Sequence, residues 1–409
     1  MQLLIVTQYY WPENFRINDL TTELVKRGHN VTVLTGFPNY PSGIVFQEFK
    51  STPKEFLTYN GVKIVRVPII PRGKRKIQLV FNYLSFIFTA STIGLFRLRK
   101  QNYDAIFVFE PSPVTVCLPA ILYRYIKKVP LAFWVLDLWP DTLEALGIVR
   151  SRRILRLIGG MVSFIYNRND LILGQSMSFL PNIKKYCNHN NIRYFPGWAE
   201  SIFNDEMTKD QLIETKNNFF NIVFTGNIGE SQDFPAILDA AERLKKDKKI
   251  RWIIVGDGRM FDWLKTEVKK RSLTDCVILK GRYPMEKMPF FFNQASALLV
   301  SLKDEPIFSY TIPGKLQAYL KAGKPILAML NGEAAELIRM NKCGITCKAS
   351  DSSALASAAL RLKNLSDEDK DKMGKQSLVL SKTKFDRTIQ INQLENWLQQ
   401  LADQKPLVP

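Results

Sequence analysis

Two successive series of short apolar runs, separated by segments of helical length, constrain the fold of this chain more than any other feature. Strands that are apolar on both faces are typical of parallel sheets covered by helices on both sides. A polar stretch over residues 199–220 separates the two series, so the sequence predicts two doubly wound α/β domains. The first series lies at residues 3–9, 31–35, 63–67, 105–109, 131–136, 171–173 and 192–195, and the second at 222–225, 252–255, 277–279, 297–302, 325–330 and 344–348.

The same polar stretch predicts the domain boundaries. We expect an N-terminal domain over residues 1–200, a second domain over 201–385, and a terminal helix and tail over 386–409. A length of 409 residues suits two domains, since one domain commonly takes about 100–200 residues. The opening residues, MQLLIVTQYYWP, have the pattern of a buried strand rather than of a signal peptide.

Charge is distributed unevenly along the chain. It holds 57 Lys and Arg against 38 Asp and Glu, a net charge of +19, and residues 1–200 contain 25 of the basic residues against 12 acidic ones. Such an excess predicts an anionic partner, either a membrane surface, a nucleic acid or a phosphorylated substrate. Five cysteines, an odd number, with Cys117 and Cys276 in or beside apolar runs, indicate reduced thiols and a cytosolic or cytosol-facing protein. The two histidines are isolated, so no metal site is predicted.

One apolar segment departs from the alternating pattern. Residues 77–96 carry no charge, and basic clusters flank them on both sides. The length reaches that of a membrane-spanning helix, but polar side chains dilute the segment and a span would interrupt the first domain. We therefore expect a helix packed in or on that domain, with one face touching lipid. Residues 150–164 show a second mixture of arginines and apolar residues.

Glycines follow three strands of the second series, at residues 226–229, 256–258 and 281. Ligands of doubly wound sheets bind beyond the carboxyl ends of the strands, where glycine lets the backbone approach a phosphate. A further segment, YTIPGKLQAYLKAGKP over residues 310–325, places Lys315 in the first turn of a predicted helix. A cation is disfavoured there by the helix dipole unless an anion is bound beside it, although a solvated lysine is the simpler alternative.

These motifs resemble those of the family 4 glycosyltransferases. The stretches GNIGESQDF, IIVGDGR, VILKGRYP and SLKDEPIFSYTIPGKLQAYLKAGKPILA occur in the order found in the nucleotide-sugar domain of that family. In the first half, QYYWPENFRINDLTTELVKRGHNVTVLTGFPNYPSG, FEPSPVT and WVLDLWPDTLEALG are similar to the subgroup that builds O-antigen, capsule and colanic acid, with its L-fucosamine-transferase-like members.

The resemblance implies a GT-B fold, in which two Rossmann-like doubly wound domains face each other across a cleft. It implies a retaining hexosyltransferase that needs no cofactor and no metal. Such an enzyme moves a sugar, an amino- or deoxy-hexose, from a nucleotide-sugar donor, with UDP preferred, to a lipid-linked oligosaccharide in bacterial surface polysaccharide synthesis. The run Asp367-Glu368-Asp369 lies in a lysine-rich helical stretch and is expected to be a solvated face rather than a metal site.

The chain departs from the family pattern on the donor side. Many relatives carry two glutamates where this chain has Tyr310 and Ala318, which leaves Glu305 as the nearest upstream carboxylate. Asn227 and Gln232 stand where many relatives place an Arg and a Lys. By the resemblance, stabilisation of the departing diphosphate therefore falls to Lys315, to Arg282 and to backbone amides. The predicted donor-binding residues are Gly226, Asn227, Gly229, Gly256, Asp257, Gly281, Tyr283, Glu305, Pro313 and Gly314.

The acceptor side also departs from the pattern. Residues 12–15, PENF, replace a Gly-Gly loop, and Asp137 stands where many relatives have a histidine. Asp137 is the predicted catalytic residue that orients the acceptor hydroxyl, with a helix cap as the alternative. The other predicted acceptor-binding residues are Tyr9, Trp11, Asn14, Asn39, Tyr40, Glu110 and Trp139.

The partners that follow are a nucleotide-sugar, a polyprenyl-diphosphate-linked acceptor and an anionic inner membrane surface, without nucleic acid. The basic first domain predicts a peripheral position on the cytoplasmic face of that membrane. Three alternatives remain at this stage. They are an epimerase-like GT-B enzyme that acts on the donor alone, an NAD-dependent oxidoreductase, and a non-catalytic basic protein that binds membrane or nucleic acid. The absence of a Gly-x-Gly-x-x-Gly after any strand counts against the oxidoreductase.

Overall fold

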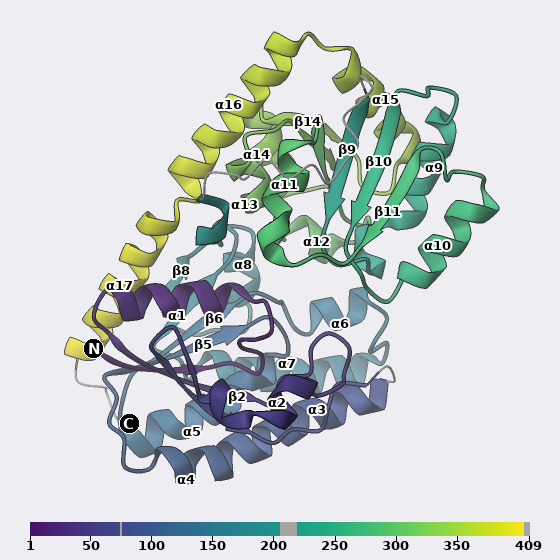
Figure 1. Cartoon of the computed structure of the whole chain (residues 1–409). Helices are drawn as coiled ribbons and strands as arrows, with labels where there is room; N and C mark the ends of the chain where they lie inside the picture. Colours follow the sequence, from purple (N-terminus) through teal and green to yellow (C-terminus); the bar gives the residue numbers. More distant parts are fainter. Residues whose placement is uncertain (74–75, 205–218, 405–409) are drawn as a thin grey trace. The chain divides into compact units, whose positions relative to one another are not determined.

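The computed structural model describes residues 1–73, 76–204 and 219–404. The chain divides into two compact units (Figure 1). Unit 1 comprises Met1–Phe195 together with Thr388–Pro409, and unit 2 comprises Pro196–Arg387. The terminal helix predicted at residues 387–402 is present as α17 (Arg387–Asp403), and the division counts it almost entirely with unit 1.

Unit 1 contains a sheet whose strands run in the order β3-β4-β2-β1-β5-β6-β7-β8. All neighbouring pairs are parallel except β3 with β4, a two-residue antiparallel edge that the sequence pattern did not predict because it is too short to show a period. β1 pairs with β2 on one side and with β5 on the other, so the strand order reverses at β1. The strands are β1 (Gln2–Val6), β2 (Asn30–Gly36), β3 (Thr58–Tyr59), β4 (Val62–Val67), β5 (Ala105–Glu110), β6 (Leu131–Val135), β7 (Leu171–Gly174) and β8 (Ile192–Tyr194).

Helices cover both faces of this sheet (Figure 1). α1 and α17 are joined by charged side chains, because Glu395 accepts from Arg27 at 2.9 Å and lies 2.7 Å from His29. The other face is covered by α3, α4, α5 and α7. The helices of the unit are α1 (Arg16–Lys26), α2 (Gln47–Ser51), α3 (Lys76–Thr89), α4 (Leu95–Leu98), α5 (Cys117–Lys127), α6 (Asp141–Ala145), α7 (Arg152–Tyr166) and α8 (Phe179–Lys184), with a π-helical turn at Ala90–Gly94 between α3 and α4.

The apolar segment predicted at residues 77–96 is the continuous helical run of α3, the π-helical turn and α4. The fully buried Asn82 of α3 accepts from Gln8 at 2.6 Å and donates to the Ile70 carbonyl at 2.6 Å, which attaches this helix to the end of β1. Residues 77–98 have the length and apolar composition of a membrane span, a test that core helices of soluble proteins also pass, and 22% of the apolar window is buried. The helix is therefore packed on unit 1, as expected, while several of its large apolar side chains are exposed: Ile77, Val80, Phe81, Leu84, Phe88 and Phe96.

Unit 2 contains a fully parallel sheet in the order β11-β10-β9-β12-β13-β14. The order reverses between β9 and β12, which pair through Ala297 and Leu298. All six predicted strands of this half are confirmed, because near-continuous apolar runs bounded by glycine or charge leave little alternative. The strands are β9 (Phe220–Thr225), β10 (Ile250–Val255), β11 (Val277–Gly281), β12 (Ala297–Ser301), β13 (Ile326–Met329) and β14 (Gly344–Cys347).

Two hydrophobic cores lie on the two faces of the unit 2 sheet. One joins the sheet to α9, α10 and α15, and the other joins it to α11, α13 and α14. Asp367, Glu368 and Asp369 are exposed in the first turn of α16, where acidic side chains suit the helix dipole, as predicted. The helices are α9 (Phe234–Leu244), α10 (Phe261–Lys270), α11 (Met288–Asn293), α12 (Pro306–Ser309), α13 (Gly314–Lys321), α14 (Glu333–Met340), α15 (Ser352–Asn364) and α16 (Asp367–Lys384).

Candidate active site

Each sheet has a point at its carboxyl edge where the strand order reverses, and ligands of doubly wound sheets bind at such points. In unit 2 this point lies between the ends of β9 and β12. In unit 1 it lies between the ends of β1 and β5. The two edges carry different residues.

The loops after β9 and β10 pack backbone to backbone. The Gly226 amide donates to the Val255 carbonyl at 2.9 Å, and the Ile228 amide donates to the Asp257 carbonyl at 2.9 Å. A Cβ at Gly256, whose φ is +146°, would lie 1.9 Å from the Gly226 carbonyl oxygen. Glycine is therefore required at this position by both the conformation and the lack of space.

Lys315 lies beside these loops, in the first turn of α13 as predicted. Its ammonium nitrogen is 3.5 Å from the centroid of the Phe224 ring, and it would lie 3.6 Å from a Cβ at Gly226. The stem of the side chain is partly exposed, whereas the nitrogen is buried and has no hydrogen-bond partner among the described residues. The alternative of a solvated surface lysine is excluded by this burial.

The burial of Lys315 lowers its pKa to about 7. A buried cation in the first turn of a helix is unfavourable on its own, because both desolvation and the helix dipole oppose the charge. An anion bound beside it would reverse both effects. Perturbed groups of this kind are concentrated at functional sites.

The loop after β9 uses most of its own amides. Besides Gly226 and Ile228, the Gly229 amide donates to Gln232 Oε1 at 3.0 Å. The predicted use of the amides of residues 226–229 for a phosphate would therefore require these bonds to break. Gln232, which stands near the position of a lysine in many relatives, closes the loop instead of pointing a charge into the site.

The other predicted donor-side residues surround the same edge. Asn227, Asp257 and Arg282 are exposed, and Asp257 accepts from the Gly258 amide at 2.7 Å. Tyr283 packs edge-on against Phe291 at 5.0 Å. The backbone of Glu305 caps the start of α12, Gly281 has a φ of +73°, and Pro313 and Gly314 form the entry to α13.

Two carboxyl groups define the edge of unit 1. Glu110, at the end of β5, is fully buried and accepts from the amides of Leu136 at 3.3 Å and Asp137 at 3.2 Å. Burial, and then the nearby charge of Asp137, raise the pKa of Glu110 well above its ordinary value. Glu110 is therefore a buried support for the turn that carries Asp137.

Asp137 follows β6 and is surrounded by hydrogen-bond donors. It accepts from the indole of Trp139 at 3.2 Å and from the hydroxyls of Thr142 and Ser112. Burial raises the pKa of Asp137, while these donors oppose the rise. Ser112 has a φ of +118°, a conformation that is rare outside glycine and is found where structure is held for function. Ser112 also hydrogen-bonds Tyr83 of α3.

Aromatic side chains occupy the ends of β1 and β2. Tyr9 stacks on Phe15 with ring centroids 5.6 Å apart, and Tyr40 contacts both rings. Trp11 lies apart from this group, between Phe56 and Tyr59. Two predicted polar residues flank the aromatic group: Asn14 is exposed, and the buried Asn39 accepts from the Arg72 amide at 2.8 Å.

Glu13 ties these loops together. Its carboxylate accepts from the amides of Asn39 at 2.8 Å, Tyr40 at 2.7 Å and Tyr10 at 3.1 Å. Burial raises the pKa of Glu13 to about 7, and the three amide donors together with Arg66 limit the rise. The residues that replace the Gly-Gly loop of many relatives therefore hold two strand ends in place.

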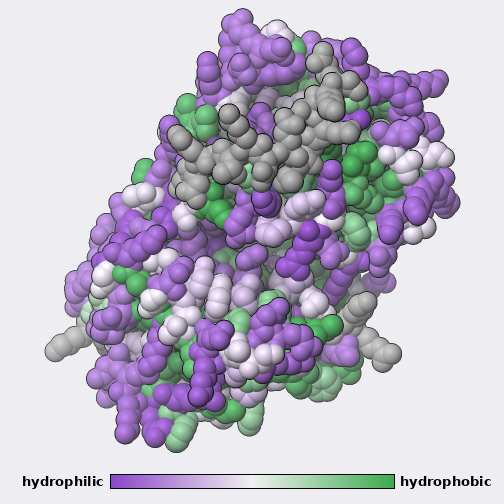
Figure 2. Space-filling view, in the orientation of Figure 1, coloured by the Kyte–Doolittle hydropathy of each residue, from purple (hydrophilic) through white to green (hydrophobic). Residues whose placement is uncertain are grey.

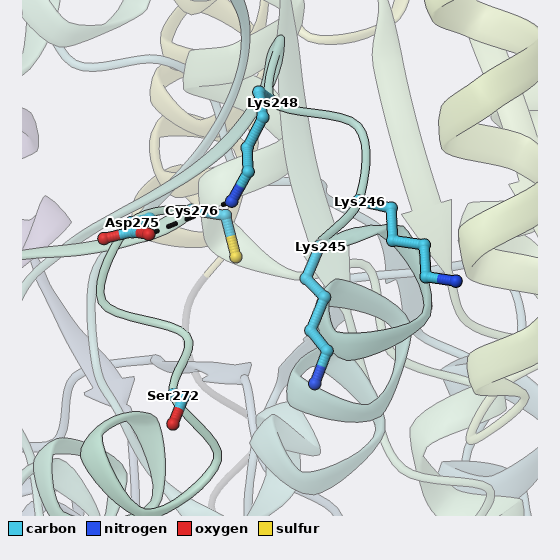
Figure 3. A pocket seen from close by; sticks show the side chains of 6 residues that line it. All are labelled: Lys245, Lys246, Lys248, Ser272, Asp275 and Cys276. Atoms are coloured by element: carbon cyan, nitrogen blue, oxygen red, sulfur yellow. Dashed lines mark ion pairs between the residues drawn. The ribbon is translucent and has the colours of Figure 1, made fainter.

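A surface hollow of about 370 Å³ lies at the opposite end of the unit 2 sheet, before β10 and β11 begin (Figure 3). It is lined by Lys245, Lys246, Lys248, Ser272, Asp275 and Cys276, and Lys248 lies 3.9 Å from Asp275. Since ligands of such sheets bind at the carboxyl edge, this hollow is not the donor site. Within the described residues, no group of three or more His, Cys, Asp or Glu side chains is arranged to hold a metal ion.

Residues 204–378, which include the glycine loops and Lys315, match the family described as glycosyl transferases group 1. Over that part of its length, which is less than half of the chain, the protein is similar to the group 1 glycosyltransferases. It is similar to the probable glycosyltransferase WbjE of Pseudomonas aeruginosa, with 27% identity over 70% of this chain and 72% of that protein. It is also similar to the colanic acid biosynthesis glycosyl transferase WcaI of Escherichia coli K12, with 26% identity over 63% of this chain and 66% of that protein.

Among solved structures, this glycosyltransferase is similar to HepE of Anabaena in complex with UDP. The TM-score is 0.68 at 14% identity, over 98% of this chain and 100% of the other. The predicted GT-B fold is thereby confirmed, and the oxidoreductase and the non-catalytic alternatives are set aside.

Several residues at these edges were not predicted from the sequence. Glu13, Ser112 and Thr142 lie within the stretches that carry the resemblance, and Tyr83 lies in the apolar segment, but none was assigned a role. Their roles come from contacts between loops distant in the chain. Arg72 belongs to the basic cluster before the apolar segment, and the sequence pattern predicted no separate role for it. The sequence signal that could have indicated such residues is the presence of a polar side chain shortly after the end of each predicted strand.

Proposed function

We propose that this glycosyltransferase moves a sugar, with retention of configuration, from a UDP-sugar to a hydroxyl of a lipid-linked oligosaccharide in bacterial surface polysaccharide synthesis. The observation that carries the proposal is the buried Lys315 ammonium, without a hydrogen-bond partner among the described residues, beside the glycine loops. A dianionic diphosphate is the ligand that such a cation favours. HepE was solved with UDP, and the two relatives bear the names "Probable glycosyltransferase WbjE" and "Putative colanic acid biosynthesis glycosyl transferase WcaI".

Lys315 has the main electrostatic role. When the bond between the sugar C1 and the diphosphate oxygen breaks, its electron pair remains on the diphosphate, and a cation held at that position stabilises the developing charge. Arg282 is exposed on the same edge and supplements this charge. Asp137 orients the acceptor hydroxyl, whose oxygen forms the new bond to C1 while its proton passes to the departing diphosphate oxygen. Glu305 contacts the donor sugar or ribose.

The proposal is tested by calorimetric titration with UDP, GDP and NAD, comparing the wild type with Lys315→Met. We expect selective UDP binding that weakens at least tenfold in the variant, and turnover that falls about 100-fold or more. Lys321→Met, at the other end of α13, is the matched control and should bind UDP normally. Binding of GDP instead would change the donor, and unchanged binding by Lys315→Met would contradict the role of Lys315.

The same variant separates function from folding. The pKa of Lys315 falls from 10.5 to about 7 on folding, so the folded state without ligand is destabilised by this charge at pH 7. The destabilisation disappears as the pH rises towards 10.5. We therefore expect Lys315→Met to unfold at the same or a higher temperature than the wild type, which excludes misfolding as the reason for lost binding.

We also propose peripheral association of unit 1 with an anionic membrane. Exposed apolar side chains gather on α3, α4 and α7, and Figure 2 shows hydrophobic surface along the lower margin of that unit. Basic side chains next to such a surface add attraction to anionic lipid. The exposed apolar residues are Ile77, Val80, Phe81, Leu84, Phe88, Phe96, Ile154, Leu157 and Phe164, and the exposed basic residues are Arg97, Arg99, Lys100, Arg150, Arg152, Arg153 and Arg156.

Flotation with anionic and with neutral vesicles tests this association. We expect binding to anionic vesicles that is reversed by salt and weakened by Phe88→Asp, whose side chain is 68% exposed. Met340→Asp, at an equally exposed apolar position of unit 2 (76%), is the control and should bind normally. Release by detergent alone would indicate a spanning helix instead.

A further inference from the structure

Arg72 is a charged side chain at the carboxyl edge of unit 1 that the proposed function has not used. It follows β4 by five residues, and its amide donates to Asn39 Oδ1 at 2.8 Å. The loop after β2 approaches it so closely that a Cβ at Gly43 would lie 1.6 Å from the Arg72 carbonyl oxygen. The backbone of Arg72 is therefore held by its neighbours rather than free in a surface loop.

The guanidinium group of Arg72 is surrounded by tyrosines. It lies 5.3 Å from the centroid of the Tyr40 ring and interacts with the hydroxyl of Tyr9, and Tyr83 is also nearby. Burial raises the pKa of Tyr9 and Tyr83, so these hydroxyls are neutral at pH 7. No described carboxylate forms an ion pair with Arg72.

A partly buried guanidinium without a carboxylate contrasts with the other inward-facing arginines of the unit. Arg124 forms a bidentate pair with Asp170, with distances of 2.9 and 2.6 Å. Arg66 donates to the carbonyls of Gly36, Phe56 and Trp11. Arg72 has neither arrangement, and the donors of a guanidinium match the oxygens of a phosphate in a fork.

The neighbours of Arg72 lead to two features that a lipid-linked acceptor must contact. These are the proposed hydroxyl-orienting Asp137 and an exposed apolar surface. Tyr83 links it to the reaction side, because Tyr83 hydrogen-bonds Ser112, which in turn hydrogen-bonds Asp137. On the other side, the helix that carries Tyr83 exposes Phe81 and Leu84, each about half accessible to solvent. An anionic group at Arg72 would thus lie between the proposed hydroxyl-orienting residue and an exposed apolar helix.

We propose that Arg72 binds the phosphate or diphosphate group of the acceptor, whose lipid then follows the exposed face of α3. The inference rests on the proposed function, because that function supplies the lipid-linked acceptor. It assigns a second phosphate site on unit 1, which is separate from the site at Lys315 on unit 2. Tyr9 and Tyr40 contribute the walls of this site, and the Tyr9 hydroxyl adds a hydrogen-bond donor.

The test is a titration of the full-length protein, held at saturating UDP, with farnesyl diphosphate and separately with inorganic pyrophosphate. UDP occupies the donor site, so the added diphosphate reports on a second site. We expect the wild type to bind farnesyl diphosphate more tightly than pyrophosphate, and Arg72→Gln to weaken binding of both by about 10–100-fold. UDP affinity should be unchanged in this variant.

Two further variants keep the result interpretable. Arg72→Lys retains the charge but not the fork, and should give an intermediate loss. Lys185→Gln removes an exposed cation of the same unit that lies outside both proposed surfaces, and should bind like the wild type. Circular dichroism confirms that each variant is folded.

Three outcomes would overturn the assignment. Equal binding of farnesyl diphosphate by the wild type and Arg72→Gln would remove Arg72 from the site. Equal affinity for pyrophosphate and farnesyl diphosphate would show that the lipid makes no contact and that the ligand is a free phosphate. Loss of UDP affinity in Arg72→Gln would transfer Arg72 to the donor site. A wild type that does not bind UDP would contradict the proposed function itself, which is a separate result.

Discussion

At the carboxyl edge of the unit 2 sheet, glycines lie at or directly after the ends of β9, β10 and β11, whereas in unit 1 the ends of β1, β5 and β6 carry aromatic or acidic side chains. In unit 2, the backbones after β9 and β10 touch, and a single buried cation, Lys315, lies beside them. In unit 1, Glu110, Asp137 and their hydroxyl partners form a network between loops. The same topology thus provides a backbone surface in one unit and a side-chain surface in the other.

This difference predicts which substitutions each unit tolerates least. A site made of close backbones tolerates no added Cβ, while a site made of side chains depends on particular functional groups. The donor, whose diphosphate is common to many substrates, suits the first kind of surface. The acceptor, which must be distinguished by its hydroxyls, suits the second.

A side chain added where the two backbones touch in unit 2 should have the largest effect on stability. Gly256→Ala should destabilise unit 2 by about 3 kcal/mol or more, because the Cβ meets a carbonyl oxygen and the backbone is strained. Gly160→Ala in α7 is the control, since nothing lies within 4 Å of its Cβ, and should stabilise the helix by roughly 0.5–1 kcal/mol. Calorimetric unfolding measures both, and equal effects would show that the packing of these loops is unimportant.

On the side-chain surface, Asp137→Asn should lower kcat about 100-fold through the loss of the negative charge that orients the hydroxyl. UDP affinity should stay within about twofold of the wild type, because Asp137 lies on unit 1. Asp141→Asn serves as the control, since Asp141 accepts from Asn182 at 2.8 Å rather than joining the network. A kcat near that of the wild type would reduce Asp137 to a helix cap.

Proton uptake on UDP binding should distinguish the unit 2 site from the unit 1 site. Because the pKa of Lys315 is about 7 in the free protein, the amine is mostly neutral at pH 8. A bound diphosphate favours the ammonium form, so UDP binding should take up a proton and weaken up to about tenfold per pH unit above 7. Titration in buffers of different ionisation enthalpy measures this uptake, which should be absent in Lys315→Met.

The smallest effect concerns the support of the acceptor loops. Glu13→Gln should cost about 1–2 kcal/mol, because the amide that replaces one oxygen faces the Tyr10 N–H. The pKa of Glu13 rises on folding, from 4.5 to about 7, so its protonation stabilises the folded state at low pH and this stabilisation is lost as the pH rises through 7. The deficit of the variant, measured by urea unfolding, should be larger at pH 5 than at pH 8.

The donor side could be predicted more fully than the acceptor side. The position of Lys315 follows from the local pattern of a proline-glycine turn before a helix, and the glycines follow from their places after strands. The burial of its ammonium could not be predicted, because Phe224 and Gly226 come from a strand end about 90 residues earlier. On the acceptor side, Tyr83, Ser112 and Arg72 are brought together by three separate loops and a helix.

The two doubly wound sheets could be predicted from the sequence alone, since strands buried on both faces appear as short continuous apolar runs, unlike surface loops. The resemblance to glycosyltransferases also follows from the sequence, because its motifs lie within short stretches of chain. Which charged groups lose water, and which partners they find, depends on the tertiary structure. Examples are the buried amine of Lys315, the buried carboxyl of Glu110 and the guanidinium of Arg72 among tyrosines. Burial and pairing depend on neighbours distant in the chain, and local sequence patterns do not record them.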